Sequence, residues 1–258
     1  ARRLVKQGDG ILTLPNVEQQ YTGPTDVWAG TLNFDGKLLL SSLWLNRFAE
    51  LNSKDGKFMG GIKADYASII RPGGENSMGT ITTSTYEMGF GSRLMLDLYS
   101  DGLKADQVSA QKLTIEKKTG SAWETYGPAS VQPVNEVVQH FKEGATELEP
   151  GDYLIGHVDE VVGSLDNIKI EGVTKHKAIL KLDEKKDLYL SISGVREASE
   201  IVWTGNTSAI WDYAGTDNFY VLSDPNKTPD VFVEKNVINF TDEAKSFTIT
   251  LKTGDELL

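Results

Sequence analysis

Short runs in which apolar and polar residues alternate recur along most of the chain. Alternation with a period of two places one set of side chains on each face of a β-strand. In the first half such runs are Ile11–Leu14, Thr31–Phe34, Thr80–Thr83, Arg93–Leu98 and Lys112–Glu116. In the second half they are Tyr153–Ile155, Ile168–Ile170, Ala178–Leu182, Leu188–Ile192 and Phe247–Leu251. The pattern predicts an all-β chain of many short strands.

Glycine punctuates these runs, often after aspartate or proline. Turn signatures stand at Asp35-Gly36, Asp55-Gly56, Asp101-Gly102 and Pro150-Gly151. Two segments, Leu43–Leu51 and Asn135–Lys142, have a spacing that predicts helix, but both are too short to cross over between strands of a doubly wound sheet. The fold classes that remain are a sandwich, a barrel and a solenoid.

Two changes of rhythm indicate how the chain is organised. Residues 120–149 break the strand pattern, and we interpret them as an insertion that projects from a regular body. After residue 196 the sequence becomes rich in aromatic residues, including Trp203 and Trp211, for which we expect core packing or the covering of an open end. We therefore predict a unit over residues 1–196 and the start of a second β-rich unit over residues 197–258.

Composition excludes several classes of protein. The 258 residues are 39% hydrophobic, which is enough for a packed core. A formal net charge of -11 repels phosphate backbones, so we expect no nucleic-acid partner. There is no cysteine, which excludes disulfides and thiolate metal sites, and no long apolar run, so we expect no membrane insertion by this segment. Because the first residue is Ala1 and no signal peptide precedes the strands, we expect a piece of a longer chain.

Three motifs near the N-terminus occur in a fixed order. Lys6–Leu14 reads K-Q-G-D-G-I-L-T-L, Tyr21–Thr25 reads Y-T-G-P-T, and Ala29–Phe34 reads A-G-T-L-N-F. This series resembles the autotransporter-associated β-strand repeat, with its K-x-G-x-G-x-L-x-L, Y-T-G-x-T and x-G-T-L parts. The resemblance implies a right-handed parallel β-helix in an exported passenger, displayed on the surface of a Gram-negative bacterium.

A β-helix also agrees with the physics of the pattern. Each coil pairs its backbone with the coils before and after it, about 4.8 Å apart, and inward side chains stack into one core. We expect roughly 20 to 25 residues per coil, with a β-sandwich as the alternative fold. The resemblance implies an extracellular or cell-surface location, associated with the outer membrane. It also implies neighbouring domains of the same parent chain as partners, together with a host or microbial glycan or surface protein.

Carboxylates are candidate catalytic groups because β-helices also host polysaccharide lyases and hydrolases. Asp97, Asp101 and Asp106 lie close in sequence, and Asp65 and Glu75 flank Arg71. Turns and solvated faces explain these carboxylates better, so we predict no catalytic residues, no cofactor and no enzymatic activity. The three histidines, His140, His157 and His176, lack metal-ligand spacing, so we predict no metal site.

Aromatic residues give the one candidate binding site. Trp28, Trp44 and Tyr21 could present rings on which sugar faces stack, whereas core packing is the plainer interpretation. The function predicted first is a non-catalytic structural or adhesive module of a secreted or surface-exposed bacterial protein. A glycan-binding module of a carbohydrate-utilisation surface protein is the alternative, and a β-helical polysaccharide lyase or hydrolase is the second alternative.

Overall fold

The computed structural model describes residues 2–75, 77–115, 133–140, 148–173, 176–195, 197–212, 215–233 and 235–251. Contacts within the chain divide it into two compact units. Unit 1 comprises Ala1–Ile170 and Ile179–Ser191, and unit 2 comprises Glu171–Ala178 and Ile192–Leu258. All of residues 197–258 therefore fall in unit 2.

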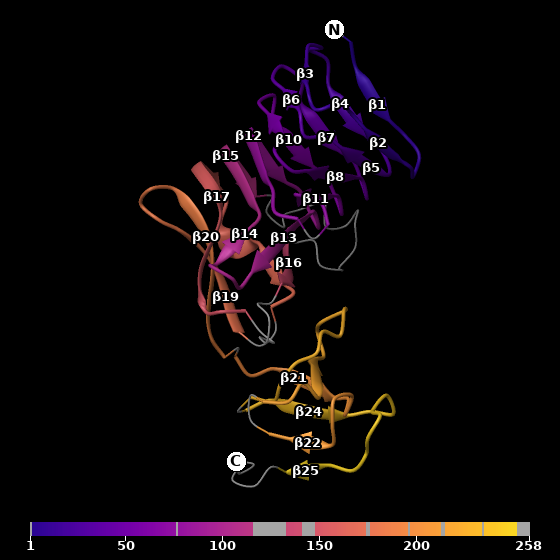
Figure 1. Cartoon of the computed structure of the whole chain (residues 1–258), viewed down its shortest axis with the longest axis vertical. Coiled ribbons are helices and arrows are strands. Elements are labelled where there is room, and N and C mark those ends of the chain that lie inside the picture. Colours follow the sequence, from indigo (N-terminus) through magenta and orange to yellow (C-terminus); the bar gives the residue numbers. More distant parts are fainter. Residues whose placement is uncertain are drawn as a thin grey trace. The chain divides into compact units, whose positions relative to one another are not determined.

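Unit 1 begins as a coil of three faces, each built from parallel strands (Figure 1). The first face consists of β1 (Leu4–Lys6), β4 (Thr25–Val27), β7 (Leu43–Leu45) and β10 (Ile62–Ala64). The second consists of β2 (Ile11–Thr13), β5 (Thr31–Asn33), β8 (Glu50–Ser53) and β11 (Ile69–Pro72). The third consists of β3 (Glu18–Gln19), β6 (Lys37–Leu38) and β9 (Lys57–Phe58). The parallel β-helix predicted from the sequence is confirmed, and the β-sandwich alternative, whose two facing sheets are antiparallel, is wrong.

The register between strands gives the length of each coil. Thr25 pairs with Leu4 and with Leu43, and Leu43 pairs with Ile62. The first three coils therefore take 21, 18 and 19 residues, so the first lies within the predicted range and the other two lie just below it. Because every strand pairs with its counterpart one coil away, the backbone hydrogen bonds run along the coil axis.

The coil changes after β10, where the third and first faces share single long strands. β12 (Thr80–Met88) pairs with β9 through Thr82 and Thr83 and with β10 through its last three residues. The strands that follow it in this sheet are β15 (Gln107–Ile115), β17 (Gly151–Val162), β20 (Asp187–Val195) and β19 (His176–Leu182). The second face continues with β13 (Arg93–Tyr99), β16 (Val134–His140) and β18 (Lys169–Glu171). β14 (Lys104–Ala105) pairs antiparallel with β13, and η1 (Leu165–Asn167) precedes β18.

Inward side chains form continuous columns through unit 1. One column of the second face consists of Leu12, Leu32, Leu51, Ile70 and Leu94. From Leu32 onward each of these side chains is at most 5% exposed. Burial of one such side chain contributes about 1.5–3 kcal/mol. The period-two alternation in the sequence is thus the signal of this core.

The corner between the first and second faces repeats one backbone conformation. Gly30, Phe48, Ala67 and Gly91 have φ angles of 68°, 60°, 54° and 62°. This left-handed region costs an L-residue about 1–2 kcal/mol and glycine almost nothing. Gly30 also has no room for a side chain, because a Cβ there would lie 2.4 Å from the carbonyl oxygen of Gly10. The glycine of the A-G-T-L motif is therefore a structural requirement of the corner.

Both segments for which the sequence predicted helix form strands. Leu43–Leu51 contains β7 and the start of β8, separated by a corner. Residues 134–140 form β16, which pairs with β13 from Arg93↔Val134 to Tyr99↔His140. Lys142 lies outside the described residues. The helix prediction is wrong because the weak helical spacing yields to backbone pairing with the neighbouring coils.

The same strand bears on the predicted insertion. β16 lies within residues 120–149, so residues 134–140 of this stretch belong to the coil. Residues 120–132 and 141–147 lie outside the described residues.

Unit 2 contains two parallel strand pairs around an aromatic core. β21 (Glu200–Trp203) pairs with β24 (Val237–Phe240), and β22 (Ile210–Trp211) pairs with β25 (Thr250–Leu251). β23 (Phe219–Val221) pairs antiparallel with β21.

Trp203 is fully buried, with its ring centroid 6.5 Å from that of Trp211 and 5.1 Å from that of Phe219. Its indole Nε1 donates a hydrogen bond of 2.8 Å to the carbonyl of Ser246. Trp203 and Trp211 therefore serve core packing, one of the two roles expected for them.

Candidate functional site

Trp28 and Trp44 stand on the outer surface of the first face of unit 1. Trp44 is the central residue of β7 and pairs with Asp26 of β4, two residues before Trp28. Trp28 directly follows β4, so the two tryptophans stand on adjacent coils two positions apart in register. Each tryptophan is 49% exposed. This arrangement leaves indole surface open to a ligand ring.

A lysine flanks Trp44 on the next coil. Lys63 of β10 pairs with Trp44, and its Nζ lies 5.3 Å from the centroid of the Trp44 ring. A cation at this distance is attracted by the electron density of the ring face. The lysine thus places positive charge over the ring of the half-exposed Trp44.

The neighbouring corner adds a second aromatic group. Cζ of Arg47 lies 4.9 Å from the ring centroid of Tyr66, and the rings of Phe48 and Tyr66 meet edge to face at 6.3 Å. Phe48 is 69% exposed although its backbone is in the left-handed region. We call the whole set the aromatic corner: Trp28, Trp44, Phe48, Tyr66, Arg47 and Lys63.

Sequence reasoning missed four members of the aromatic corner. The register of the coils brings Lys63 to Trp44, and it brings Tyr66 to Arg47 and Phe48 of the coil before. The signal that could have found them is Phe48, a bulky residue at the corner position that Gly30 holds one coil earlier. A side chain kept in a costly backbone conformation while exposed indicates a role other than core packing.

Tyr21 is held by a hydroxyl network instead of presenting a free ring edge. Its hydroxyl lies 2.7 Å from Thr25 Oγ1, which lies 3.0 Å from Ser41 Oγ. Ser41 donates a hydrogen bond of 2.7 Å to the carbonyl of Gly23. The Y-T-G-x-T motif thus ties its own tyrosine to its last threonine and fastens the turn to the next coil.

Tyr21 also lines a groove at the first coil. The groove has a volume of about 730 Å³ and is lined by Arg2, Arg3, Leu4, Gln20, Tyr21 and Thr22. The guanidinium of Arg3 donates a hydrogen bond to Asp26, whose side chain is 2% exposed. One of the two arginine charges is therefore balanced by this buried carboxylate.

Two of the acidic residues considered for catalysis do come together. Asp106 accepts a hydrogen bond of 2.8 Å from the Gly79 amide and one of 2.9 Å from the Asp97 amide. Asp106 is 1% exposed, and burial raises its pKa to about 7 against the opposing effect of these two hydrogen bonds. Both carboxyl oxygens are engaged by backbone, so this group holds the β13–β14 hairpin and offers no access to a substrate.

Asp97 faces a histidine from the next coil. Its Oδ1 lies 2.9 Å from Nε2 of His140, and the His140 ring stacks on Tyr99 at 4.3 Å. Asp101 is exposed in the turn of this hairpin. The three aspartates therefore do not form an acid/base pair around a shared opening.

The other suggested carboxylate group is not assembled either. Arg71 donates a hydrogen bond of 2.8 Å to Glu50 of the preceding coil rather than joining Asp65 and Glu75.

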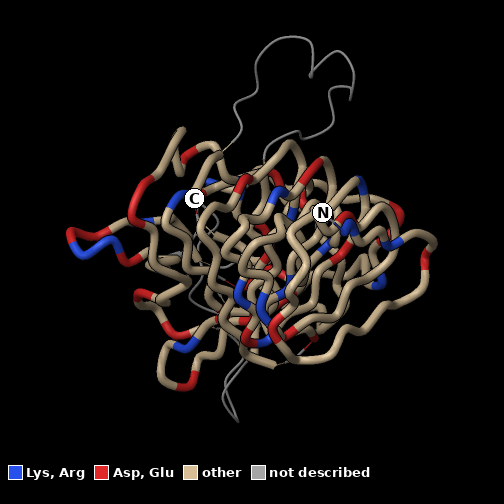
Figure 2. Tube along the Cα trace, turned by 90° about the horizontal axis from the view of Figure 1, so that it is seen from above, with Lys and Arg blue, Asp and Glu red and all other residues tan. Residues whose placement is uncertain are grey.

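Within the described residues, no three His, Cys, Asp or Glu side chains gather as metal ligands would. Figure 2 shows acidic and basic positions interspersed along the trace of the described chain.

Comparison with curated proteins found no match to the chain. Among the described residues, no helix has the length and apolar character needed to cross a membrane. A family model described as passenger-associated-transport-repeat matches residues 4–34, which run from β1 through β5 to Phe34. The match points to a surface-exposed or secreted protein and confirms the resemblance carried by Lys6–Leu14, Tyr21–Thr25 and Ala29–Phe34. Residues 4–34 are thus a repeat of the kind found in autotransporter passengers.

Proposed function

We propose that the chain is a structural module of a passenger-type protein, exposed on or secreted from a Gram-negative bacterium. The observation that carries the proposal is the coincidence of sequence repeat and coil. The matched residues 4–34 fill the first coil and the start of the second, and the second and third coils repeat nearly the same length. Such a body would hold neighbouring domains of its parent chain away from the membrane.

Physical chemistry supports a spacer role. In a parallel β-helix every coil is bonded to the next by backbone hydrogen bonds and by a continuous apolar column, so the stack resists bending and compression. Sites that need moving loops are not required for such a role. We therefore favour a non-catalytic module.

Adhesion through a glycan is the second candidate, and the aromatic corner favours it. Two half-exposed tryptophans on adjacent coils form a surface suited to stacking with the faces of sugar rings. Lys63 and Arg47 place positive charge beside that surface. A sugar that carries a carboxylate would satisfy both features, because its ring can stack while its charge pairs with a cation.

A glycan array tests this second candidate. The purified chain should bind acidic oligosaccharides, and Trp28→Ala and Trp44→Ala should each lower binding at least tenfold. Phe247→Ala serves as the control, since it removes an exposed aromatic ring of unit 2 and should leave binding unchanged. A silent array would remove the glycan proposal and leave the spacer proposal standing.

Incubation with polysaccharides tests the non-catalytic proposal. We expect neither new reducing ends nor unsaturated-uronate absorbance, because the buried carboxyl of Asp106 cannot reach a substrate. Release of either product would replace the proposal by the lyase or hydrolase alternative. Circular dichroism of the same sample should show β structure with little helix.

A further inference from the structure

One inward position of unit 1 breaks the apolar column of the second face. Asn135 of β16 pairs with Leu94 of β13 and so takes the place that leucine or isoleucine holds in the preceding coils. The side chain is 2% exposed. An amide at such a position needs hydrogen-bond partners, because burial removes it from water.

A second polar group faces the same region. Tyr86 of β12 is also 2% exposed, and its inward position is held by Ile62 in the coil before and Leu113 in the coil after. Burial raises the pKa of its hydroxyl well above the ordinary value, which keeps the group neutral. Neither the Tyr86 hydroxyl nor Asn135 Oδ1 has a hydrogen-bond partner among the described residues.

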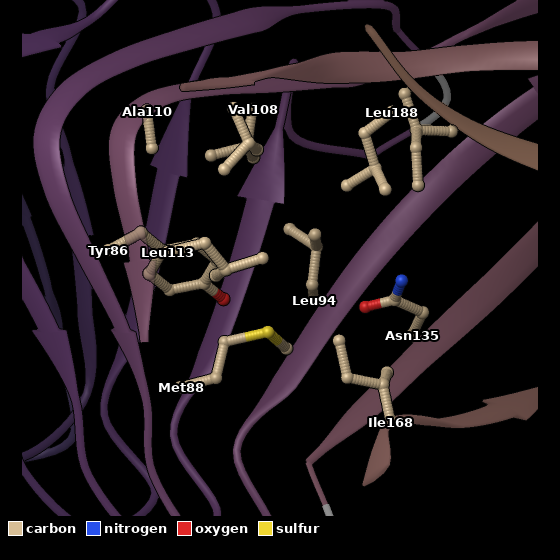
Figure 3. Close-up of a pocket in the computed structure, with 11 residues that line it drawn as sticks. Tyr86, Met88, Leu94, Val108, Ala110, Leu113, Asn135, Ile168 and Leu188 are labelled. Carbon is tan, nitrogen blue, oxygen red and sulfur yellow. The ribbon is translucent and has the colours of Figure 1, made fainter. Parts of the chain in front are cut away.

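The two groups line one pocket (Figure 3). The other residues that line it are apolar and include Met88, Leu94 and Leu113. In the close-up the hydroxyl of Tyr86 and the carboxamide of Asn135 are both directed toward the space between them. The pocket has a volume of about 20 Å³. A buried water molecule needs roughly 10–15 Å³, together with at least two polar partners.

We propose that this pocket binds one water molecule, which donates a hydrogen bond to Asn135 Oδ1 and shares a second with the Tyr86 hydroxyl. The volume excludes larger ligands. Asn135 Oδ1 can only accept a hydrogen bond, whereas the Tyr86 hydroxyl can donate or accept one. A single water satisfies both.

The bound water has a consequence for the register of the coil. β15 ends at Ile115 and β16 begins at Val134, so more residues separate these two strands in the sequence than separate successive strands of the first coils. A long connection constrains strand register less than a tight turn does. A shift of β16 by one residue would turn Asn135 outward and place Val134 or Glu136 inward, and the water would lose one partner. The polar pair thus selects the observed pairing of Leu94 with Asn135.

A double-mutant cycle on the chain tests the proposal. Asn135→Leu should raise the equilibrium constant for unfolding about tenfold, and Tyr86→Phe severalfold, because each removes one partner of the water. The double variant should return to within about threefold of the original value, since no polar group then remains in the pocket. Met88→Leu, a volume-conserving change in the same lining, is the control and should have little effect.

The opposite pattern would overturn the proposal. If the pocket is dry, each single substitution removes an unsatisfied polar group and lowers the unfolding constant. A crystal structure that resolves ordered water gives an independent reading should a variant fail to fold. One density peak within hydrogen-bond distance of Tyr86 Oη and Asn135 Oδ1 is expected, and an empty pocket or a direct bond between the two side chains would contradict it.

Discussion

The ammonium group of Lys6 donates a hydrogen bond of 2.8 Å to the carbonyl of Ala29, one coil further along the stack. The same group donates to the carbonyl of Gly8, in the corner of its own coil. Lys6 is 7% exposed and lies on the column that continues with Val27 and Leu45. The lysine of the K-x-G-x-G motif therefore fastens two successive corners together from inside.

Replacing this lysine should weaken the first coils. Lys6→Met keeps the length of the side chain but leaves the carbonyls of Gly8 and Ala29 without their donor. We expect a loss of about 1–2 kcal/mol in the free energy of unfolding, measured by urea denaturation. Lys57→Met, at an exposed position of β9, should change it by less than about 0.5 kcal/mol. A Lys6→Met variant as stable as the original would show that the ammonium group contributes nothing net.

The repeated corner between the first and second faces predicts opposite effects for substitutions at two of its equivalent positions, Gly30 and Ala67. Gly30→Ala should destabilise the fold by about 2 kcal/mol or more, because the new Cβ would meet the carbonyl of Gly10 and φ is left-handed. Ala67→Gly should stabilise it by about 1 kcal/mol by relieving a left-handed alanine. Thermal unfolding of both variants checks the pair. Equal signs for the two changes would contradict the common corner.

Asp106 predicts a pH dependence of stability. Its pKa is about 7 in the folded chain, whereas an unfolded aspartate titrates near about 3.9. Between these values the folded state holds more protons than the unfolded state, so the free energy of unfolding falls as pH rises from about 4 to about 7. The contribution is fully present below about pH 4 and lost above about pH 7, and its size is on the order of 4 kcal/mol.

Asp106→Asn should remove this slope. The amide stays neutral at every pH, while one of the two backbone hydrogen bonds, from Gly79 or from Asp97, is lost. Denaturant midpoints at a series of pH values test the prediction. Asp101→Asn, in the exposed turn of the same hairpin, is the matched control and should keep the slope. An unchanged slope in Asp106→Asn would assign the pH dependence to other groups.

His157 should titrate above the ordinary range. The hydrogen bond from its ring to Asp187, 2.9 Å long, is the main cause of a raised pKa, and Asp159 at 3.3 Å adds to it. Because the folded pKa is raised, any stabilisation is present at low pH and fades as pH rises through that pKa. NMR titration should show a lower pKa for His157 in Asp187→Asn and a smaller decrease in Asp159→Asn. The reverse order would contradict the assignment.

The strands and the coil could be predicted because their signal is local. Alternation in runs such as Thr31–Phe34 and Arg93–Leu98 indicates strand by itself, and the glycines mark the corners. The segment Leu43–Leu51 misled because Trp44, Phe48 and Leu51 are apolar at spacings of four and three residues, which also suit a short helix. Only pairing with the neighbouring coils decides between the two.

The site could be predicted only in part, for a similar reason. Trp28 and Trp44 are conspicuous in the sequence, but whether a tryptophan is half-exposed or buried like Trp203 depends on the face of the coil that it occupies. The contact of Lys63 with Trp44 and the meeting of Asp97 with Asp106 depend on the coil register and on the β13–β14 hairpin. A single sequence does not carry that register.

The repeat length of the first coils also bears on how such a protein changes over generations. Thr25 pairs with Leu4 and Leu43, one coil away on either side. Among the described residues, each strand of these coils likewise pairs only with its counterparts in the adjacent coils. An in-frame duplication of one 18-to-21-residue block would therefore lengthen the body by one strand spacing, about 4.8 Å, while leaving the other contacts intact. Recombination could therefore change the length of the coil body in steps of one coil.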